Sequence, residues 1–427
     1  MEAKVKKISL LLIGLLGVFL SFISNNENEN SVASTLQVGV SKTNITPTTP
    51  IRMSGYGNRD EPFKGVHDSL YVTATVFYDG SEKAALITAD LIGFSHTFCE
   101  ETIAKIESST GIKKDFILLS ANHNHGGPVN KTYGENADPN VEKYVAELQQ
   151  KIINAVTQAN GSLQPAMVGM GVGSCTMNIN RRARFADGTI WLGRNPDGPC
   201  DHDVAVVRID DLDRNPMALF VNWPCHGTVG GQENYQITGD WMGAAARFVE
   251  NSFESQVIVP VTAGASGDIN PIYGPNNKFG DIEAIGMLVG EEVVRIATSI
   301  ETFPNGNIEA SMMTVMANGK KPLDNRKPNQ KLESTEKQPI NLGALKVGNI
   351  LFAGVSGELM TEIGMRIKAE SPLKNTIIIT HCNGSSGYLC TNQSYPEGGY
   401  EVMVSRTMPG TEYLISDNLK KMINSIQ

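Results

Sequence analysis

Short runs of β-branched and aromatic residues alternate along this chain with longer segments of helical periodicity, and this alternation constrains the fold most. The strand-like runs are Leu36–Val40, Leu70–Phe77, Ala84–Thr88, Val204–Ile209, Met217–Trp223 and Val257–Val261. The helical segments are Val141–Ala159, Trp241–Ser252 and Ile282–Ile300, where apolar residues recur every three or four positions. Interleaved strands and helices are typical of an α/β fold, so we expect a mixed β-sheet core flanked by helices.

The length of the chain leaves its domain organisation open. With 427 residues, of which 41% are hydrophobic, the sequence can bury a large core. The segment Ala317–Pro339 is rich in Lys, Asn, Pro and Glu and is typical of an exposed loop between two strands. Because the strongest candidate functional residues lie on both sides of it, we expect one catalytic domain over residues 36–427.

The first 35 residues predict targeting rather than folded structure. Lys4, Lys6 and Lys7 precede the apolar stretch Ile8–Ile23, and the polar run Asn25–Asn30 follows it. This order predicts a signal peptide or an uncleaved N-terminal anchor followed by a polar spacer. We therefore expect a secreted or periplasmic protein, anchored to the membrane if the segment is retained.

Charge and cysteine content narrow the partners and the chemistry. The formal net charge is −9 and no long basic run is present, which argues against a nucleic-acid partner. The six cysteines permit disulfides in an oxidising compartment, with Cys382 and Cys390 as the first pair to test, but buried free thiols fit equally well. The sequence leaves the oligomeric state open.

Two histidines stand directly after a buried-strand pattern. His123 and His125 follow the apolar run Phe116–Ser120, and in extended backbone residues two apart face the same side. Three other segments repeat this placement, because His226 follows Met217–Trp223, Glu358 follows Ile350–Val355, and Tyr388 comes shortly after Ile377–Thr380. Ligands of open α/β sheets bind outside the carboxyl ends of the strands, so this placement predicts a metal site there.

Each of these residues also has a plain structural reading. A lone His-x-His is often satisfied by hydrogen bonds in a loop, and Glu358 alone would be assigned to the N-terminus of the following helix, whose dipole favours a carboxylate. Tyr388 alone would be assigned to the core. Together, two imidazoles and a carboxylate match the ligands that zinc prefers, with one position left open in a catalytic site.

The ordered set of motifs resembles the neutral ceramidase family over nearly the whole chain after residue 35. The matching segments are Val38–Pro47, Gly55–Arg59, Gly65–Asp68, His123–His125, Asn178–Arg181, Asn222–His226, Gly239–Asp240, Gly357–Glu358, Gly387–Thr391 and Pro396–Glu401. The resemblance implies the catalytic N-terminal domain of this family without its C-terminal immunoglobulin-like domain. It also implies a zinc-dependent amide hydrolase that cleaves ceramide or a related N-acyl amine.

The resemblance assigns a role to each candidate residue. By it, one Zn²⁺ per chain is bound by His123, His226, Glu358 and Tyr388, His125 is the general acid/base, and Arg181 and Tyr400 contact the substrate carbonyl. Zinc-bound water with a pKa of about 7 is a nucleophile at neutral pH, and a neighbouring histidine can take and return its proton. Arginine and tyrosine can donate hydrogen bonds to the developing oxyanion. The resemblance further implies a lipid or small-molecule amide as partner and allows peripheral contact with a membrane.

One departure from the family pattern falls in the loop Gly267–Pro271. Asn270 stands where the family's ceramidases hold a catalytically implicated serine, and Ser266 is near but shifted. This favours a zinc-activated water over a serine-dependent mechanism.

Two other functions remain open from the sequence. The polar, glycine-rich loops Gly126–Gly127 and Gly398–Gly399 are consistent with a non-lipid amide, such as an N-acyl amino sugar, as substrate. A noncatalytic lipid- or carbohydrate-binding relative would keep the fold and is expected to lack ligands. All four predicted ligand positions and His125 are filled, which favours an enzyme.

Overall fold

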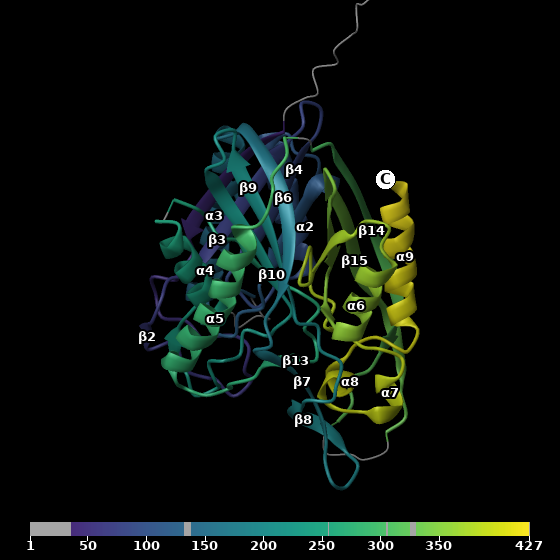
Figure 1. Cartoon of the computed structure of the whole chain (residues 1–427). Coiled ribbons are helices and arrows are strands. Elements are labelled where there is room, and N and C mark those ends of the chain that lie inside the picture. The colour runs from purple at the N-terminus through teal and green to yellow at the C-terminus, as the bar shows by residue number, and fades with distance from the viewer. Residues whose placement is uncertain (1–35, 132–137, 255, 305, 325–329, 427) are drawn as a thin grey trace, which may run out of the picture.

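The computed structural model describes residues 36–131, 138–254, 256–304, 306–324 and 330–426 (Figure 1). Residues 1–35 lie outside this range, so the signal peptide or anchor stays a prediction. Among the described helices, none is both long and apolar enough to cross a lipid bilayer. All six cysteines lie in the described range and are free thiols, as the second of the two cysteine interpretations expects.

A mixed eight-stranded sheet forms the larger half of the core. Its strand order is β12-β10-β9-β6-β1-β3-β4-β5, and the pairs β4–β5 and β10–β12 are parallel while their neighbours are antiparallel. The strands are β1 (Gln37–Asn44), β3 (Tyr71–Tyr78), β4 (Lys83–Ala89), β5 (Ile117–Ala121), β6 (Gln164–Ser174), β9 (Asp203–Asp211), β10 (Pro216–Trp223) and β12 (Val261–Ala263).

A second sheet of four strands lies against the first. It has the order β14-β15-β16-β18, formed by β14 (Ile308–Lys320), β15 (Ser334–Val347), β16 (Ile350–Val355) and β18 (Asn375–Ile379), with only β16–β18 parallel. Smaller pairings join β2 (Gly65–Val66) to β11 (Gln236–Ile237), β7 (Asn178–Arg184) to β8 (Ile190–Asn195) and β13 (Ile269–Pro271), and β17 (Glu358–Leu359) to β19 (Tyr388–Leu389).

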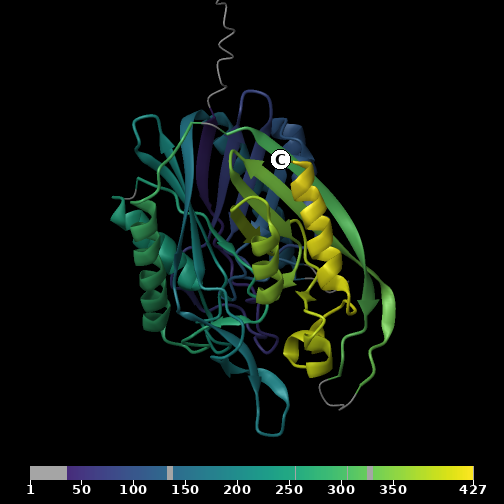
Figure 2. The same cartoon turned by 45° about the vertical axis from the view of Figure 1, so that its right-hand side comes forward.

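The two large sheets pack face to face, and helices cover both outer faces. Apolar side chains of both sheets share one cluster, in which the rings of Phe220 and Phe352 meet with centroids 5.4 Å apart. The larger sheet is covered by α2 (His96–Thr110), α3 (Pro139–Gly161), α4 (Asp240–Ser252) and α5 (Phe279–Ala297), and the smaller one by α6 (Thr361–Glu370) and α9 (Thr411–Ser425). Figures 1 and 2 show α9 on the outer side of the smaller sheet. The short elements are η1 (Lys114–Phe116), α7 (Ser394–Glu397) and α8 (Tyr400–Val404).

Helix α3 shows why the periodic segments fold as expected. The side chain of Asp138 accepts a hydrogen bond from the backbone N–H of Asn140, and Pro139 occupies the first turn. The apolar stripe that includes Tyr144 and Leu148 is buried against the larger sheet. The predicted mixed sheet core flanked by helices is confirmed, although its arrangement as four layers, helix on sheet on sheet on helix, was not foreseen.

Two predicted boundaries are wrong. Strand β12 begins only at Val261, because Pro260 has no N–H to donate to a ladder and the run before it meets β10 through isolated contacts such as Leu219 N–H to Ile258 O. The segment 317–339 is not one exposed loop. Strand β14 extends to Lys320 and β15 begins at Ser334, because the long hairpin satisfies backbone groups that composition alone would assign to solvent.

Candidate metal centre

Strand ends of both large sheets deliver the predicted ligands to one place. His123 and His125 follow β5, and His226 follows β10, both in the larger sheet. Glu358 lies just beyond β16 of the smaller sheet and pairs with Tyr388 in the parallel β17–β19 ladder. The site therefore lies at the carboxyl ends of the parallel pairs.

The ligand atoms of this cluster are close together and buried. Oε2 of Glu358 lies 3.3 Å from Nε2 of His123 and 3.4 Å from Nε2 of His226. The two imidazole centroids are 4.6 Å apart, and His123 and His226 are only 4% and 1% exposed. Tyr388 is buried beside them, so the structure brings all four predicted ligands into one cluster.

Backbone carbonyls fix which imidazole nitrogen faces the cluster. Nδ1 of His123 lies 2.9 Å from the carbonyl oxygen of Ile92, and Nδ1 of His226 lies 2.7 Å from that of Ser266. Because a carbonyl only accepts, each Nδ1 donates, and in the neutral ring Nε2 keeps its lone pair. Metal-bound histidines are usually oriented by such bonds.

The charge states also suit a divalent cation. Burial, followed by the neighbouring Arg181 charge, lowers the pKa of His226 to about 4, so its ring is neutral at pH 7. Burial alone would raise the pKa of Glu358, but the neighbouring imidazoles, His123 first, hold it well below its ordinary value. Oε2 of Glu358 is nevertheless buried with no hydrogen-bond partner among the described residues. A buried charged oxygen without a donor, facing two imidazole lone pairs, fits the ligand set of zinc.

His125 lies beside the ligands without sharing their carbonyl anchors. Its Nε2 is 3.2 Å from Nε2 of His123, and its Nδ1 is buried with no partner among the described residues. Burial, and then the neighbouring His123, lowers its pKa well below the ordinary value. Arg59 donates to the His125 carbonyl oxygen at 2.5 Å and fixes the backbone of this residue.

Arg181 connects the ligands to a buried acid. Its Nη1 lies 3.2 Å from Nε2 of His226, and its Nη2 donates to the Tyr388 hydroxyl at 3.1 Å. Nε donates to Glu401 at 2.7 Å, so the guanidinium is held on three sides. Tyr400 lies next to these groups, with its ring centroid 5.8 Å from that of Tyr388. All seven predicted site residues thus lie in one region.

Comparison with known proteins identifies the family of the chain. Residues 36–278 match the N-terminal domain of the neutral/alkaline non-lysosomal ceramidases. The chain belongs to this family. The resemblance stated from the sequence is thereby confirmed.

This chain matches only part of the length of its curated relatives. It is 28% identical over 292 residues to neutral ceramidase A of Dictyostelium discoideum, which covers 64% of this chain and 39% of that protein. It is 24% identical over 281 residues to neutral ceramidase of Drosophila melanogaster, covering 60% of this chain and 39% of that protein. The matched part of the chain thus spans about two fifths of the length of these curated relatives.

Solved structures share the fold. A crystal structure of neutral ceramidase from Pseudomonas aeruginosa superposes with a TM-score of 0.77 at 17% identity, covering 91% of this chain and 74% of that one. A ceramidase complexed with C2 gives a TM-score of 0.77 at 16% identity, covering 91% of this chain and 75% of that one. The four-layer architecture therefore belongs to the family.

Sequence reasoning missed His381 in this ceramidase-family site. It follows β18 directly, the same signal that singled out His123 and His226, and its ring stacks on that of His123 at 3.9 Å. His123, Glu358 and His381 also offer ligand atoms within 4.8 Å of one another. Both His123 (φ 62°) and His381 (φ 52°) adopt left-handed backbone that residues with a Cβ rarely take. Such strain collects at functional sites.

The loop that carries Asn270 supports His226. Asn270 accepts a hydrogen bond from Arg181 Nη1 at 3.2 Å, and the backbone N–H of Arg181 donates to the Asp268 carbonyl at 2.8 Å. Ser266 contributes its carbonyl to His226 rather than its hydroxyl. This loop therefore positions ligands through its backbone.

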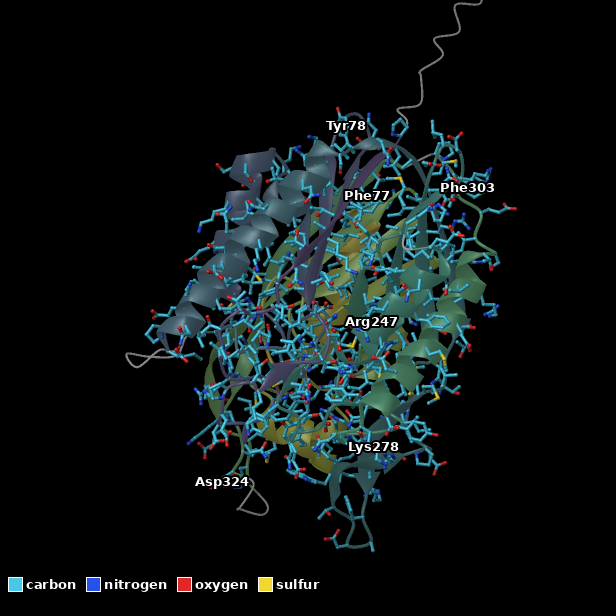
Figure 3. The ribbon with its side chains drawn as sticks, turned by 90° about the vertical axis from the view of Figure 1, so that its left-hand side faces the viewer. Phe77, Tyr78, Arg247, Lys278, Phe303 and Asp324 are labelled. Carbon is cyan, nitrogen blue, oxygen red and sulfur yellow. The ribbon has the colours of Figure 1, made fainter. Side chains whose placement is uncertain are left out.

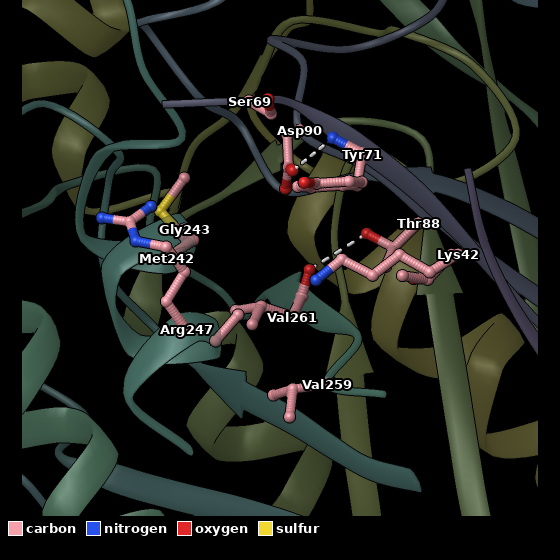
Figure 4. Close-up of a pocket in the computed structure, with 12 residues that line it drawn as sticks. Lys42, Ser69, Tyr71, Thr88, Asp90, Met242, Gly243, Arg247, Val259 and Val261 are labelled. Carbon is pink, nitrogen blue, oxygen red and sulfur yellow. Dashed lines mark hydrogen bonds between the residues drawn. The ribbon is translucent and has the colours of Figure 1, made fainter. Parts of the chain in front are cut away.

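A water-sized cavity of about 30 Å³ lies beside Asp90, and Figure 4 shows its lining. In it the Asp90 carboxylate accepts the backbone N–H of Tyr71 at 2.7 Å, and its other oxygen accepts the Asn122 amide at 2.6 Å. Because Asn122 directly precedes His123, the hydrogen bond between Asn122 and Asp90 helps to fix the loop that carries His123.

The cluster opens into a cavity of about 420 Å³. Its walls combine His123, His125, Glu358, Tyr388 and Tyr400 with apolar side chains such as Met53, Ile92 and Val129, and with the cations Arg52, Arg59 and Lys131. A cavity of this size, in which apolar side chains and convergent polar groups share the walls, is typical of a small-molecule site.

Proposed function

We propose that this chain hydrolyses an N-acyl linkage, in ceramide or a related N-acyl amine, at a zinc centre held by His123, His226, Glu358 and Tyr388. One observation carries the proposal. Oε2 of Glu358 is a buried charged oxygen with no donor among the described residues, and it lies 3.3 and 3.4 Å from Nε2 of His123 and of His226. Membership of the ceramidase family supports the reaction class.

The residues around the ligands suit amide hydrolysis. When bound, zinc lowers the pKa of a coordinated water to about 7 and polarises the amide oxygen. His125 is held beside His123, and its Nδ1 has no partner among the described residues, so it can take a proton from the attacking water and return it to the departing amine.

Arg181 and Tyr400 complete the proposed site. Arg181 is fixed by Glu401, which holds its guanidinium against His226 and Tyr388. From there it orients the two ligands and can donate to the developing oxyanion together with the Tyr400 hydroxyl. Export through the segment of residues 1–35, with cleavage or anchoring of that segment, belongs to the same proposal.

A second substrate class is a non-lipid amide such as an N-acyl amino sugar. The specific observation that favours it is the cationic and polar part of the cavity wall, where Arg52 and Lys131 have no ion-pair partner among the described residues. Such groups suit a polar or anionic amine portion better than a purely aliphatic one.

The deciding experiment measures metal content and hydrolysis in the same purified full-length protein. We expect about one zinc per chain and hydrolysis of short-chain N-acylsphingosine, with N-acetylglucosamine assayed beside it to test the second class. Glu358→Gln keeps the shape but removes the charge, and because loss of an outer-shell partner alone costs 10- to 100-fold, we expect a rate at least about 100-fold lower and loss of zinc.

Glu370→Gln is the matched control, because Glu370 lies at the exposed end of the helix that follows Glu358. It should retain both zinc and activity. Protein without stoichiometric metal, together with an unchanged rate for Glu358→Gln, would overturn the zinc-centre proposal.

A further inference from the structure

The β7–β8 hairpin exposes large apolar side chains at its tip. Phe185, Trp191 and Leu192 are 49%, 39% and 39% exposed, and they lie within eight residues of one another. Figures 1 and 2 show this hairpin projecting from the lower end of the body in both views. Apolar side chains contribute no hydrophobic stabilisation while they stay exposed to water. Three of them together on one hairpin therefore indicate a contact site for a partner.

The apolar residues occupy both faces of the hairpin. Trp191 is opposite Ala183 in the ladder, and a Cβ built on Gly193 would meet Ala183 at 2.6 Å and Phe185 at 4.0 Å, so Phe185 lies on the Trp191 side. Leu192 is opposite Arg182 and therefore faces the other way. A flat protein interface would cover one face only, whereas a narrow hairpin that is apolar on both faces is suited to insertion.

The hairpin is joined to the candidate metal centre. Strand β7 carries Arg181, and the Trp191 ring lies 6.0 Å from that of Tyr400, which lines the central cavity. Arg182 also donates to the Gly398 carbonyl at 2.9 Å, so the base of the hairpin packs on the segment before Tyr400. A surface that is contacted by the hairpin would therefore lie next to the cavity.

Exposed cations lie on the hairpin and along the nearby cavity wall. Arg184 and Arg194 are exposed on the hairpin, where the exposed acids are Asp187 in the turn and Asp197 just after β8. Arg52 and Lys131 line the cavity, and none of these four cations has an ion-pair partner among the described residues. Such cations complement an anionic surface.

We propose that the β7–β8 hairpin inserts Phe185, Trp191 and Leu192 into the interface of an anionic lipid bilayer and so places the cavity at the membrane surface. Tryptophan is enriched at membrane–water interfaces, where its ring is apolar and its N–H reaches polar groups. This docking deepens the proposed function, because an N-acyl lipid would reach the cavity directly from the bilayer. The docking itself needs no metal and no catalysis.

The tryptophans of this chain provide a direct readout. The three tryptophans are Trp191, Trp223 and Trp241, and the last two are fully buried in the core. Adding vesicles of phosphatidylcholine and phosphatidylserine should therefore shift the emission of Trp191 to shorter wavelength, with quenching by brominated lipid. The protein should bind these mixed vesicles more tightly than vesicles of phosphatidylcholine alone, and its binding to them should be weaker at high salt.

Phe185→Ser combined with Leu192→Ser removes apolar surface without touching Tyr400 or any proposed ligand. About 55 Å² of apolar surface kept from water is worth about a tenfold change in an equilibrium constant, so we expect vesicle partitioning to fall at least tenfold. Hydrolysis of a water-soluble short-chain amide should not change. The matched control is Phe303→Ser, because Phe303 is 57% exposed and lies at the other end of the molecule, as Figure 3 shows.

The outcomes separate docking from catalysis. Vesicle binding that fails in a catalytically active protein, or that survives in the double variant, overturns the docking and leaves the proposed function in place. Binding by a protein that hydrolyses no amide supports the docking and overturns the function. If light scattering shows a dimer that the double variant abolishes, the hairpin is an interface between copies and the lipid proposal is wrong.

Discussion

Glu401 is the buried acid on which the charge balance of the site depends. It is 1% exposed and bonds two guanidinium groups, with Oε1 2.7 Å from Arg181 Nε and Oε2 3.0 Å from Arg182 Nη1. Arg182 has a second carboxylate partner in Glu397, but Arg181 has no other among the described residues. Replacing Glu401 with glutamine therefore leaves one buried cation without any counter-charge.

The expected cost follows from that loss. Removing one partner of a buried ion pair typically destabilises a protein by 3–5 kcal/mol, because the remaining charge is uncompensated, so we expect Glu401→Gln to lower the free energy of unfolding by about 3 kcal/mol. Glu397→Gln is the control. Its side chain is 31% exposed and shares Arg182 with Glu401, so its loss should cost less than about 1 kcal/mol.

The pH dependence gives an independent check of the sign. Burial alone would raise the pKa of Glu401, but Arg181 and then Arg182 hold it below the ordinary value of about 4.3. A carboxyl whose pKa is depressed in the folded state stabilises the fold above its unfolded pKa, and this stability is lost as the pH falls through the folded pKa. The difference between wild type and Glu401→Gln should therefore be constant near neutral pH and shrink below about pH 4.

Urea unfolding of wild type, Glu401→Gln and Glu397→Gln at a series of pH values measures all three quantities. If Glu401→Gln costs no more than Glu397→Gln at pH 7, the buried guanidinium groups are compensated by something other than Glu401. The account of how Arg181 is held against His226 and Tyr388 would then be wrong.

Two further perturbations test how the ligand loop is supported. A methyl group at Gly126 would lie 2.4 Å from the Thr238 carbonyl oxygen, so Gly126→Ala should displace His125 and lower the rate of hydrolysis by about 100-fold. The control is Gly161→Ala, which should not change the rate because no atom lies within 4 Å of the added methyl group. Equal rates for the two variants would refute the steric argument. Burial raises the pKa of Asp90 to about 6, so the folded state binds this proton more tightly and unfolding free energy falls as pH rises from about 4 to about 6. Asp90→Asn should flatten that slope in urea titrations, and an unchanged slope would contradict it.

Local patterns in the sequence were sufficient to predict the secondary structure around the site. The apolar periodicity of Val141–Ala159 predicted helix α3, and the apolar runs before His123 and His226 predicted strands β5 and β10. These patterns were sufficient because the periodicity of a helix or strand is set by residues close together in the sequence. Long-range pairing was not predictable in this way. That β5 and β16 belong to different sheets packed face to face is decided by contacts between residues hundreds of positions apart.

The candidate site shows the same division. The placement of His123, His226, Glu358 and Tyr388 after apolar runs predicted their convergence. The family resemblance was needed to assign Tyr388 to the ligands rather than to the core, and to include Arg181. His381 carried the same strand-end signal and was passed over in favour of Tyr388, which comes later in that loop. Its stacking on His123 depends on left-handed backbone at both residues, which no periodicity encodes.

Several features that break local rules meet at this site. His123 and His381 take backbone angles that cost energy, Glu358 Oε2 and His125 Nδ1 are buried with no hydrogen-bond partner among the described residues, and Arg181 is buried as a cation. Elsewhere, capped helices and paired sheets supply the stability that offsets these costs. Because one sheet delivers His123 and His226 and the other delivers Glu358 and Tyr388, the packing of the two sheets, in which Phe220 meets Phe352, holds these residues together. The contact between the two sheets is therefore what can hold a carboxylate oxygen, without a hydrogen-bond partner among the described residues, next to two imidazole nitrogens, an arrangement that a divalent cation would complete.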